Sequence, residues 1–294
     1  LTVHQQIWQR LAPIIVLAFA LFALIGGYLY QDNLRAHLTQ VHNTALSDHA
    51  AEITTQLQQA LDAALRLSRS TATRQYAQQV QSLRGQLPLT LLPGQAEMVA
   101  DLTSVLTASS RQYVAVRYVG LDGTVWSEAV LRGAAAATNL RPQVGALTND
   151  GAFQAAVQAD TPVLSAVTMR TLALGVVEPT LRVWSPVHLA DSDTEPVGMI
   201  ELEILALPLA NVVNLTDAGE TERWLLINRD GRLLADSRAP RAYLNRMSIE
   251  TGALLNASEP ELAALVQSVK PLQVEALDNG LVSSRLINIG SAPD

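Results

Sequence analysis

The sequence contains no cysteine, few aromatic residues and a single lysine, Lys270. Without cysteine there is no disulfide, no thiolate chemistry and no zinc site with cysteine ligands, which suits an exported body without redox control. Aromatic residues make up only 4% of the chain, so its core must be built from leucine, valine, alanine and isoleucine. The net charge of −7 at pH 7 argues against nucleic acid as a partner.

Motifs of common catalytic chemistry are also missing. The sequence has no GxSxG, no HExxH, no P-loop and no kinase or cyclase motif. His42 and His49 lie seven residues apart in a helical stretch, whereas metal-binding histidines on one helix are usually three or four apart. We therefore predict no enzyme activity, no cofactor and no metal site in these residues; any catalytic output module would lie beyond residue 294.

One uncharged apolar block, Leu11 to Tyr30, stands near the start of the chain. As a helix it would be roughly 30 Å long, which matches the hydrocarbon core of a bilayer. It predicts a transmembrane helix at residues 11–30 in contact with membrane lipid, after a cytoplasmic tail at residues 1–10. The body would then lie outside a bacterial cytoplasmic membrane. The stretch Ala18 to Ala20 leaves cleavage as a signal peptide open.

A long helical pattern follows this block. Between Gln31 and Arg84 there is no proline or glycine, and apolar residues recur every three or four positions, which predicts a stalk helix over residues 31–84. An apolar stripe of this length needs a partner, either the chain's own outer domain or a second copy of the helix. A homodimer or a larger membrane assembly is therefore expected. Prolines and glycines between residues 85 and 94 end the pattern, and a shorter helix is predicted from Gln95 to Ser109.

Beyond this point the pattern changes to alternating polar and apolar residues. Strands at Tyr113 to Val119 and Thr124 to Val130 flank an Asp-Gly turn, which is a strong hairpin signal. About 108 residues later, Trp224 to Asn228 and Arg232 to Asp236 repeat the same arrangement. The other predicted elements are strands at 162–167, 180–187, 197–205, 272–276 and 281–289, and a helix at 260–269. The repeat predicts an α+β fold of two tandem modules with antiparallel sheets, at residues 85–205 and 206–294.

Four segments, in this order and spacing, resemble the double Cache sensor domain of bacterial transmembrane receptors, which include histidine kinases, diguanylate cyclases and chemoreceptors. They are the Arg-Tyr strand and turn at Val114 to Gly123, the helix and strand at Phe153 to Val167, the paired strands from Glu178 to Ile204, and the hairpin from Leu225 to Leu234. The resemblance covers about residues 31–294.

The resemblance implies two PAS-like Cache modules, one distal and one proximal to the membrane. A small molecule binds the distal module of such receptors, and a displacement of helices carries the signal across the membrane. Receptors of this family have a second span, so we expect a second span and an output module to follow Asp294. The family's amino-acid-binding signature is not legible around residues 149–153, so the resemblance does not imply an amino-acid ligand.

Five residues of the distal module are candidates for ligand binding: Arg117, Trp126, Ser165, Arg182 and Trp184. An arginine fork matches a carboxylate in a bidentate manner, and a nearby aromatic ring packs the apolar part of a ligand. This pattern predicts an anionic small-molecule ligand. In the alternative reading, the arginines pair with internal acids such as Asp122 or lie on a solvated face.

Two functions are thus open. The first is an extracytoplasmic small-molecule sensor of a membrane receptor. The second is a non-catalytic, Cache-like structural subunit of a larger membrane or surface assembly. The coding sequence beyond Asp294 distinguishes them, since a second apolar stretch favours the receptor and a stop favours the subunit.

Overall fold

The computed structural model describes residues 3–83, 92–109, 112–133, 135–159, 161–172, 175, 177–190, 194–214, 222–228, 233–239, 259–268, 274–277, 280–285 and 287. For residues 3–15, 18, 265–268, 274–277, 280 and 281 it describes the backbone alone. The chain forms two compact units. One joins Leu1–Asp48 to Ser268–Leu286, and the other joins His49–Gln267 to Ile287–Asp294.

Three helices open the chain: α1 (Val3–Arg69), α2 (Thr71–Ser82) and α3 (Gln95–Ala108). The prediction of one uninterrupted stalk helix through Arg84 is wrong, because the helix stops at Ser70. Ser70 is extended (φ −64°, ψ 145°), and its Oγ accepts a hydrogen bond from the Thr73 amide at 3.1 Å. A serine in this position satisfies an amide that α2 itself cannot pair, so it starts a new helix.

Ser70→Ala is expected to lower the free energy of unfolding by about 1 kcal/mol, because the Thr73 amide loses its acceptor at the start of α2. Thermal denaturation measures this loss. The matched control is Ser82→Ala, since the exposed Ser82 hydroxyl only donates to a carbonyl of its own helix. We expect the control to stay within about 0.5 kcal/mol of the wild type. Equal losses in the two variants would contradict the capping role.

The predicted membrane span at residues 11–30 falls within α1. Among the residues that the structure describes, no helix is both long and apolar enough to cross a membrane. The side chains of residues 11–15 and 18, which belong to the predicted span, lie outside the described set.

A seven-stranded antiparallel sheet forms the centre of the second unit. Its strands are β1 (Tyr113–Gly120), β2 (Val125–Arg132), β3 (Ala135–Asn139), β4 (Val163–Leu164), β5 (Thr168–Thr171), β6 (Val177–Val187) and β7 (Gly198–Leu205). The order is β3-β2-β1-β7-β6-β4, and β5 also pairs with β6. The last strand, β7, therefore lies between β1 and β6. The strands predicted at 113–119, 124–130, 180–187 and 197–205 are confirmed, whereas β3 and β5 were not predicted.

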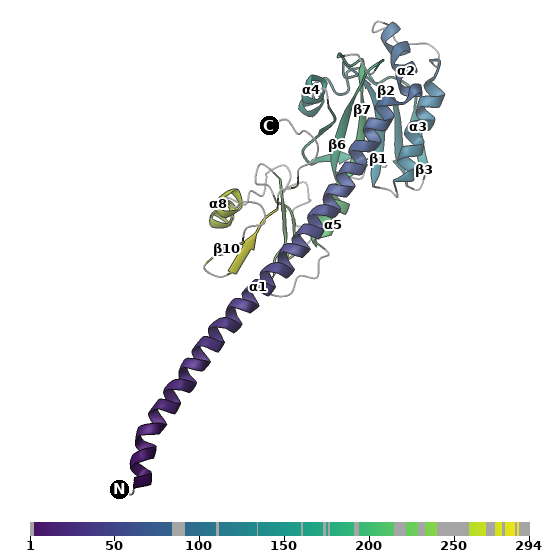
Figure 1. Cartoon of the computed structure of the whole chain (residues 1–294). Coiled ribbons are helices and arrows are strands. Elements are labelled where there is room, and N and C mark those ends of the chain that lie inside the picture. Colours follow the sequence, from purple (N-terminus) through teal and green to yellow (C-terminus); the bar gives the residue numbers. More distant parts are fainter. Residues whose placement is uncertain are drawn as a thin grey trace. The chain divides into compact units, whose positions relative to one another are not determined.

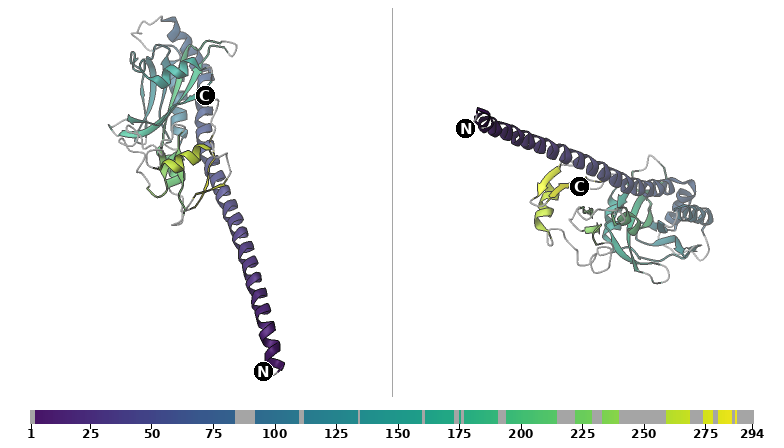
Figure 2. Two further views of the ribbon diagram at one scale, coloured as in Figure 1. Left: turned by 90° about the vertical axis from the view of Figure 1, so that its left-hand side faces the viewer. Right: turned by 90° about the horizontal axis from the view of Figure 1, so that it is seen from below.

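One face of this sheet carries the main apolar core. Alternate residues of β7, namely Ile200, Leu202 and Ile204, pack with side chains of α1, α2 and α3 such as Leu67 and Met98. Figure 1 shows these helices beside the strands, and Figure 2 shows them from two further directions. Side chains alternate across a strand, so the residues between these positions in β7 project from the opposite face. The helix α4 (Gly151–Gln158) packs on that opposite face.

The remaining elements are short. They are α5 (Leu207–Asn214), β8 (Leu225–Ile227), β9 (Leu233–Asp236), α8 (Pro260–Ser268), β10 (Val274–Leu277) and β11 (Gly280–Ser283). The predicted second hairpin is present as the antiparallel pair β8–β9, although its turn at residues 229–232 lies outside the described residues. The helix at 260–269 is confirmed, and α5 was not predicted. The division into two tandem modules stays a prediction.

Candidate functional site

The sheet face opposite the main core contains a cluster of charged side chains. In β7, Glu201 and Glu203 alternate with the apolar residues of the helix-facing side, and both are almost fully buried, with 0% and 1% of their surface exposed. Arg117 of β1 and Arg182 of β6 flank them in the neighbouring strands, where they lie directly across from Glu201 and Glu203 respectively. Burial of four charged groups side by side is costly unless they pair with one another.

Arg117 is the centre of this cluster. Its Nε donates to Glu128 Oε1 at 2.6 Å, and its Nη1 donates to Glu203 Oε2 at 2.9 Å and lies 3.2 Å from Glu201 Oε2. Burial by itself would lower the pKa of Arg117, but the charges of Glu201, Glu203 and Glu128 raise it above its ordinary value. This guanidinium therefore stays protonated and holds three carboxylates from two strands.

Arg182 forms a second pair, with Asp150. Its Nη1 and Nη2 donate to the two carboxylate oxygens of Asp150 at 2.5 and 3.2 Å. The same carboxylate caps α4 by accepting from the amides of Ala152 and Phe153. Burial would raise the pKa of Asp150, but the hydrogen bonds and the charge of Arg182, with the two amides, lower it below its ordinary value. One carboxylate thus connects the start of α4 to the middle of the sheet.

Glu201 and Glu203 are not equivalent. Burial raises the pKa of Glu201 above its ordinary value despite the opposing charge of Arg117. For Glu203, burial would also raise the pKa, but the charges of Arg117 and Arg170 lower it. Glu203 accepts hydrogen bonds from Arg117, Arg170 and Thr180. In contrast, neither carboxylate oxygen of Glu201 accepts a hydrogen bond from the described residues.

Aromatic side chains border the cluster. The guanidinium carbon of Arg182 lies 5.6 Å from the ring centroid of Trp184, which is a cation–π distance. The ring of Phe153 in α4 packs in a tilted orientation against the same indole, with ring centroids 5.4 Å apart. The indole Nε1 of Trp184 and the Nε of Arg182 are both buried without a hydrogen-bond partner in the described part of the chain. Together with Glu201, they leave several buried polar atoms unsatisfied at one place.

Four of the five predicted ligand-binding residues gather in this part of the sheet. Arg117, Arg182 and Trp184 lie on the charged face, and the Ser165 hydroxyl accepts a hydrogen bond from the Arg182 amide at 2.9 Å. The prediction of an anionic ligand assumed that both guanidinium groups are free to bind it. Instead, both are already paired with internal carboxylates. The alternative of internal pairing holds, but the partners are Glu128, Glu201, Glu203 and Asp150 rather than Asp122.

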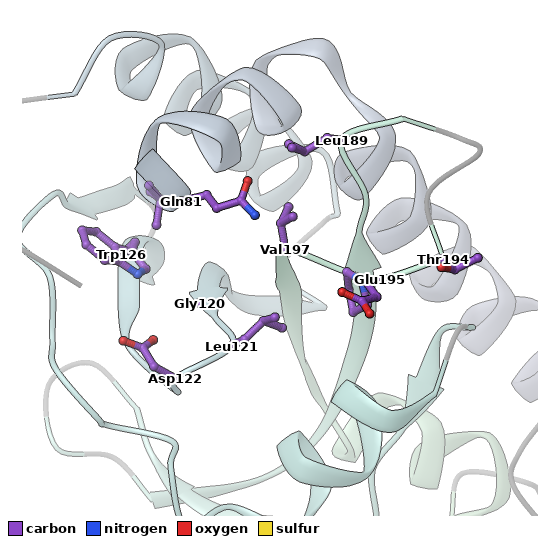
Figure 3. Close-up of a pocket in the computed structure, with 11 residues that line it drawn as sticks. Gln81, Gly120, Leu121, Asp122, Trp126, Leu189, Thr194, Glu195 and Val197 are labelled. Atoms are coloured by element: carbon purple, nitrogen blue, oxygen red, sulfur yellow. The ribbon is translucent and has the colours of Figure 1, made fainter. Parts of the chain in front are cut away.

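Trp126 is the exception, since it packs with the apolar core on the helix-facing side of the sheet. There it lines a separate cavity of about 680 Å³. Figure 3 shows Trp126, Asp122 and Gln81 around this cavity, with Glu195 on its other side. The site that the sequence assigned to one ligand is thus divided between the two faces of the sheet.

The carboxylates of the charged face were not recognised in the sequence. A usable signal exists in β7, where Glu201 and Glu203 interrupt an otherwise apolar strand at alternate positions, so that both must point to the same side. Within the described residues, no group of three or more histidine or acidic side chains is placed to hold a metal ion. The carboxylates of the cluster form ion pairs with Arg117, Arg170 and Arg182.

Comparison with known proteins gives a match in structure alone. No protein-family model and no curated protein sequence matches the chain. Among solved structures, the chain is similar to a domain described as a sensory box/GGDEF family protein from Vibrio parahaemolyticus, with a TM-score of 0.62 and 14% identity over 87% of this chain and 93% of that chain. It is also similar to the extracellular domain of the histidine kinase vpHK1S-Z8, with a TM-score of 0.60 and 13% identity over 83% of each chain.

A third similar structure is the ligand-binding domain of the Pseudomonas fluorescens chemoreceptor CtaA in complex with L-isoleucine. Its TM-score is 0.51, with 15% identity over 89% of this chain and 91% of that chain. At sequence identities this low, the structural matches establish similarity of fold and nothing more. The chain therefore has the fold of the sensory domains of bacterial receptors, as its resemblance to the double Cache family predicted.

Proposed function

We propose that this chain is the extracytoplasmic sensing part of a bacterial membrane receptor, and that a small molecule binds it at the charged face of the sheet. The fold supports the sensing role. Exposed apolar side chains along α1, which include Phe19, Phe22 and Leu24, support insertion of residues 11–30 into a bilayer, since such side chains are otherwise left in water. Ligand binding at the sheet would displace the helices that pack on it and so carry a signal toward the membrane.

The observation that carries this proposal is the state of Glu201. Four carboxylates of the cluster, from Glu128, Asp150, Glu201 and Glu203, face three guanidinium groups, from Arg117, Arg170 and Arg182. Among these described residues one negative charge is in excess, and Glu201 is the carboxylate that is fully buried and accepts no hydrogen bond from them. A ligand ammonium group would supply both the missing charge and the missing donors.

The ligand class follows from the same cluster. Besides an ammonium group for Glu201, the ligand would carry a group that competes with the internal carboxylate for the guanidinium of Arg182. A carboxylate is such a group. A small zwitterion such as an amino acid combines the two groups, and the similar CtaA domain is in complex with L-isoleucine. Trp184 and Phe153 would pack the apolar side chain of such a ligand.

Glu201→Gln is expected to stabilise the ligand-free protein and to abolish its response to ligand. Glutamine keeps the shape but removes a buried charge, which we expect to raise the free energy of unfolding by about 1 kcal/mol near neutral pH and the Tm by about 2–4 °C. Because the pKa of Glu201 is raised in the folded state, the wild type loses stability as the pH rises through that pKa. The gain in the variant should therefore disappear below the ordinary carboxyl pKa.

A thermal-shift screen of the wild type with the common amino acids and other small zwitterions provides the measurement. A ligand that raises the Tm of the wild type should leave Glu201→Gln unchanged. The matched control is Glu97→Gln, a carboxylate in the first turn of α3 outside the cluster, which should keep the full response. A wild type that responds to none of the compounds, or a Glu201→Gln variant with a full response, would contradict the proposal.

The alternative of a structural subunit has one observation in its favour, because Arg117 and Arg182 are already neutralised within the chain. In that case the cluster only stabilises the fold. The thermal-shift screen would then give no response, and purification from membranes under mild conditions would yield the chain as a fixed component of a larger assembly.

A further inference from the structure

The cavity that Trp126 lines is on the other side of the sheet from the charged cluster. It is bordered by the end of α2, by the turn between β1 and β2, and by the residues that lead into β7. Its volume of about 680 Å³ falls within the range of small-molecule sites. Among the described residues that line it, the charged side chains are the carboxylates of Asp122 and Glu195, and none is a lysine or an arginine. The cavity therefore favours a cation over an anion.

Trp126 forms an apolar wall of this cavity. Its side chain is almost fully buried, with 3% of its surface exposed. A tryptophan ring is the aromatic surface that attracts an organic cation most strongly. With two carboxylates on the same cavity, the ring lies where a cation could contact both kinds of group.

Gly120 lines the cavity at a position where a larger side chain would not fit. A Cβ at Gly120 would come within 2.8 Å of both Asp122 Oδ1 and Trp126 Nε1. Gly120 does not have a positive φ, so backbone conformation does not explain the residue. The missing side chain instead lets the carboxylate and the indole approach the same point in space.

We propose that this cavity is a second binding site, which takes a small organic ammonium ion. The Trp126 ring would attract the cation, Asp122 and Glu195 would neutralise its charge, and apolar lining residues such as Leu121 and Val197 would cover its alkyl groups. A metal ion is a poorer occupant, because the described lining residues supply two carboxylates and no other charged ligand. The proposal does not depend on the ligand of the charged face, since the two sites share no residue.

Isothermal titration of the purified full chain with choline chloride tests this proposal. We expect binding with a Kd of about 1 mM or tighter. The uncharged analogue 3,3-dimethyl-1-butanol has the same shape, and it should bind at least tenfold more weakly because it lacks the positive charge. Sodium acetate, an anion, should give no binding.

Variants separate this cavity from the charged face. Glu195→Gln, at an exposed position, should leave folding unchanged and weaken choline binding about three- to tenfold. Trp126→Phe should weaken it by a similar factor, because the smaller ring attracts a cation less strongly. Glu201→Gln should leave choline binding unchanged. The proposal is overturned if the wild type does not bind choline, if the uncharged analogue binds equally well, or if Glu195→Gln binds choline with unchanged affinity.

Discussion

Arg117→Ala is expected to lower the free energy of unfolding by about 3–5 kcal/mol near neutral pH. Removal of the guanidinium leaves Glu201 and Glu203 as buried, adjacent carboxylates without their main counter-charge. Breaking a buried ion pair by removing one partner typically costs this much, because the other charge remains in a poorly solvated place. Thermal or urea denaturation, with circular dichroism as the signal, measures the loss.

The loss of stability in Arg117→Ala should depend on pH, because it arises from buried carboxylates that have lost their counter-charge. Arg117 is the main opposing charge that keeps the pKa of Glu203 below its ordinary value, so in the variant burial should raise the pKa values of both Glu201 and Glu203. Groups whose folded-state pKa is raised stabilise the fold at low pH and lose that contribution as the pH rises. The difference between variant and wild type should therefore be smaller at about pH 4.5 than at about pH 7.

Arg170→Ala is the matched control for Arg117→Ala. Arg170 also pairs with Glu203, at 3.3 Å, but 31% of its side chain is exposed. A partly solvated pair contributes little, so we expect a loss of at most about 1 kcal/mol and a weak dependence on pH. Similar losses in the two arginine variants would show that Arg117 is not the centre of the cluster.

Gly123→Ala is expected to lower the free energy of unfolding by about 3 kcal/mol, for two reasons that act together. Gly123 has a φ of +75°, a left-handed conformation that costs other residues about 1–2 kcal/mol. In addition, a Cβ at this position would lie 2.6 Å from the Thr148 backbone nitrogen, which cannot move aside as a flexible side chain does. Chemical denaturation of the purified chain provides the measurement.

Gly133→Ala separates these two reasons. Gly133 also has a positive φ, +65°, but a Cβ there would meet nothing within 4 Å. It should therefore show only the conformational cost of about 1 kcal/mol. The Gly123 carbonyl accepts from the Leu147 amide, just before Asp150, so Gly123→Ala should also weaken the ligand response proposed for the charged face. If both glycine variants lose the same stability, steric contact with Thr148 is not important.

The local pattern of the sequence predicted the principal strands and missed elements of atypical composition. The strands at Tyr113–Gly120 and Gly198–Leu205 are rich in β-branched, aliphatic or aromatic residues and were found. The alanine-rich strand Ala135–Asn139 has one β-branched residue, Thr138, and no aromatic residue, so its own strand signal is weak. The end of α1 at Ser70 was missed because apolar residues, among them Leu67 and Tyr76, continue at helical spacing on both sides of it.

The candidate site was predicted only in part, for a physical reason. Arg117, Arg182, Trp184 and Ser165 stand out in one module of the sequence, and they do gather in space. Their partners depend on strand order, because β7 lies between β1 and β6. Glu201 and Glu203 are more than 80 residues from Arg117 along the chain, and no local pattern indicates that they neutralise it. For the same reason the separation of Trp126 from the other four could not be foreseen.

The alternation in β7 has a mechanical consequence. A slip of this strand by one residue against β1 or β6 would turn Glu201 and Glu203 into the apolar core and turn Ile200 and Leu202 toward the arginines. Both sides of the strand would then be in the wrong environment at once, so sliding of strands past one another is blocked. Any movement that a ligand induces in this part of the protein must therefore keep the strands in register, and it has to occur as a tilt or shift of whole elements.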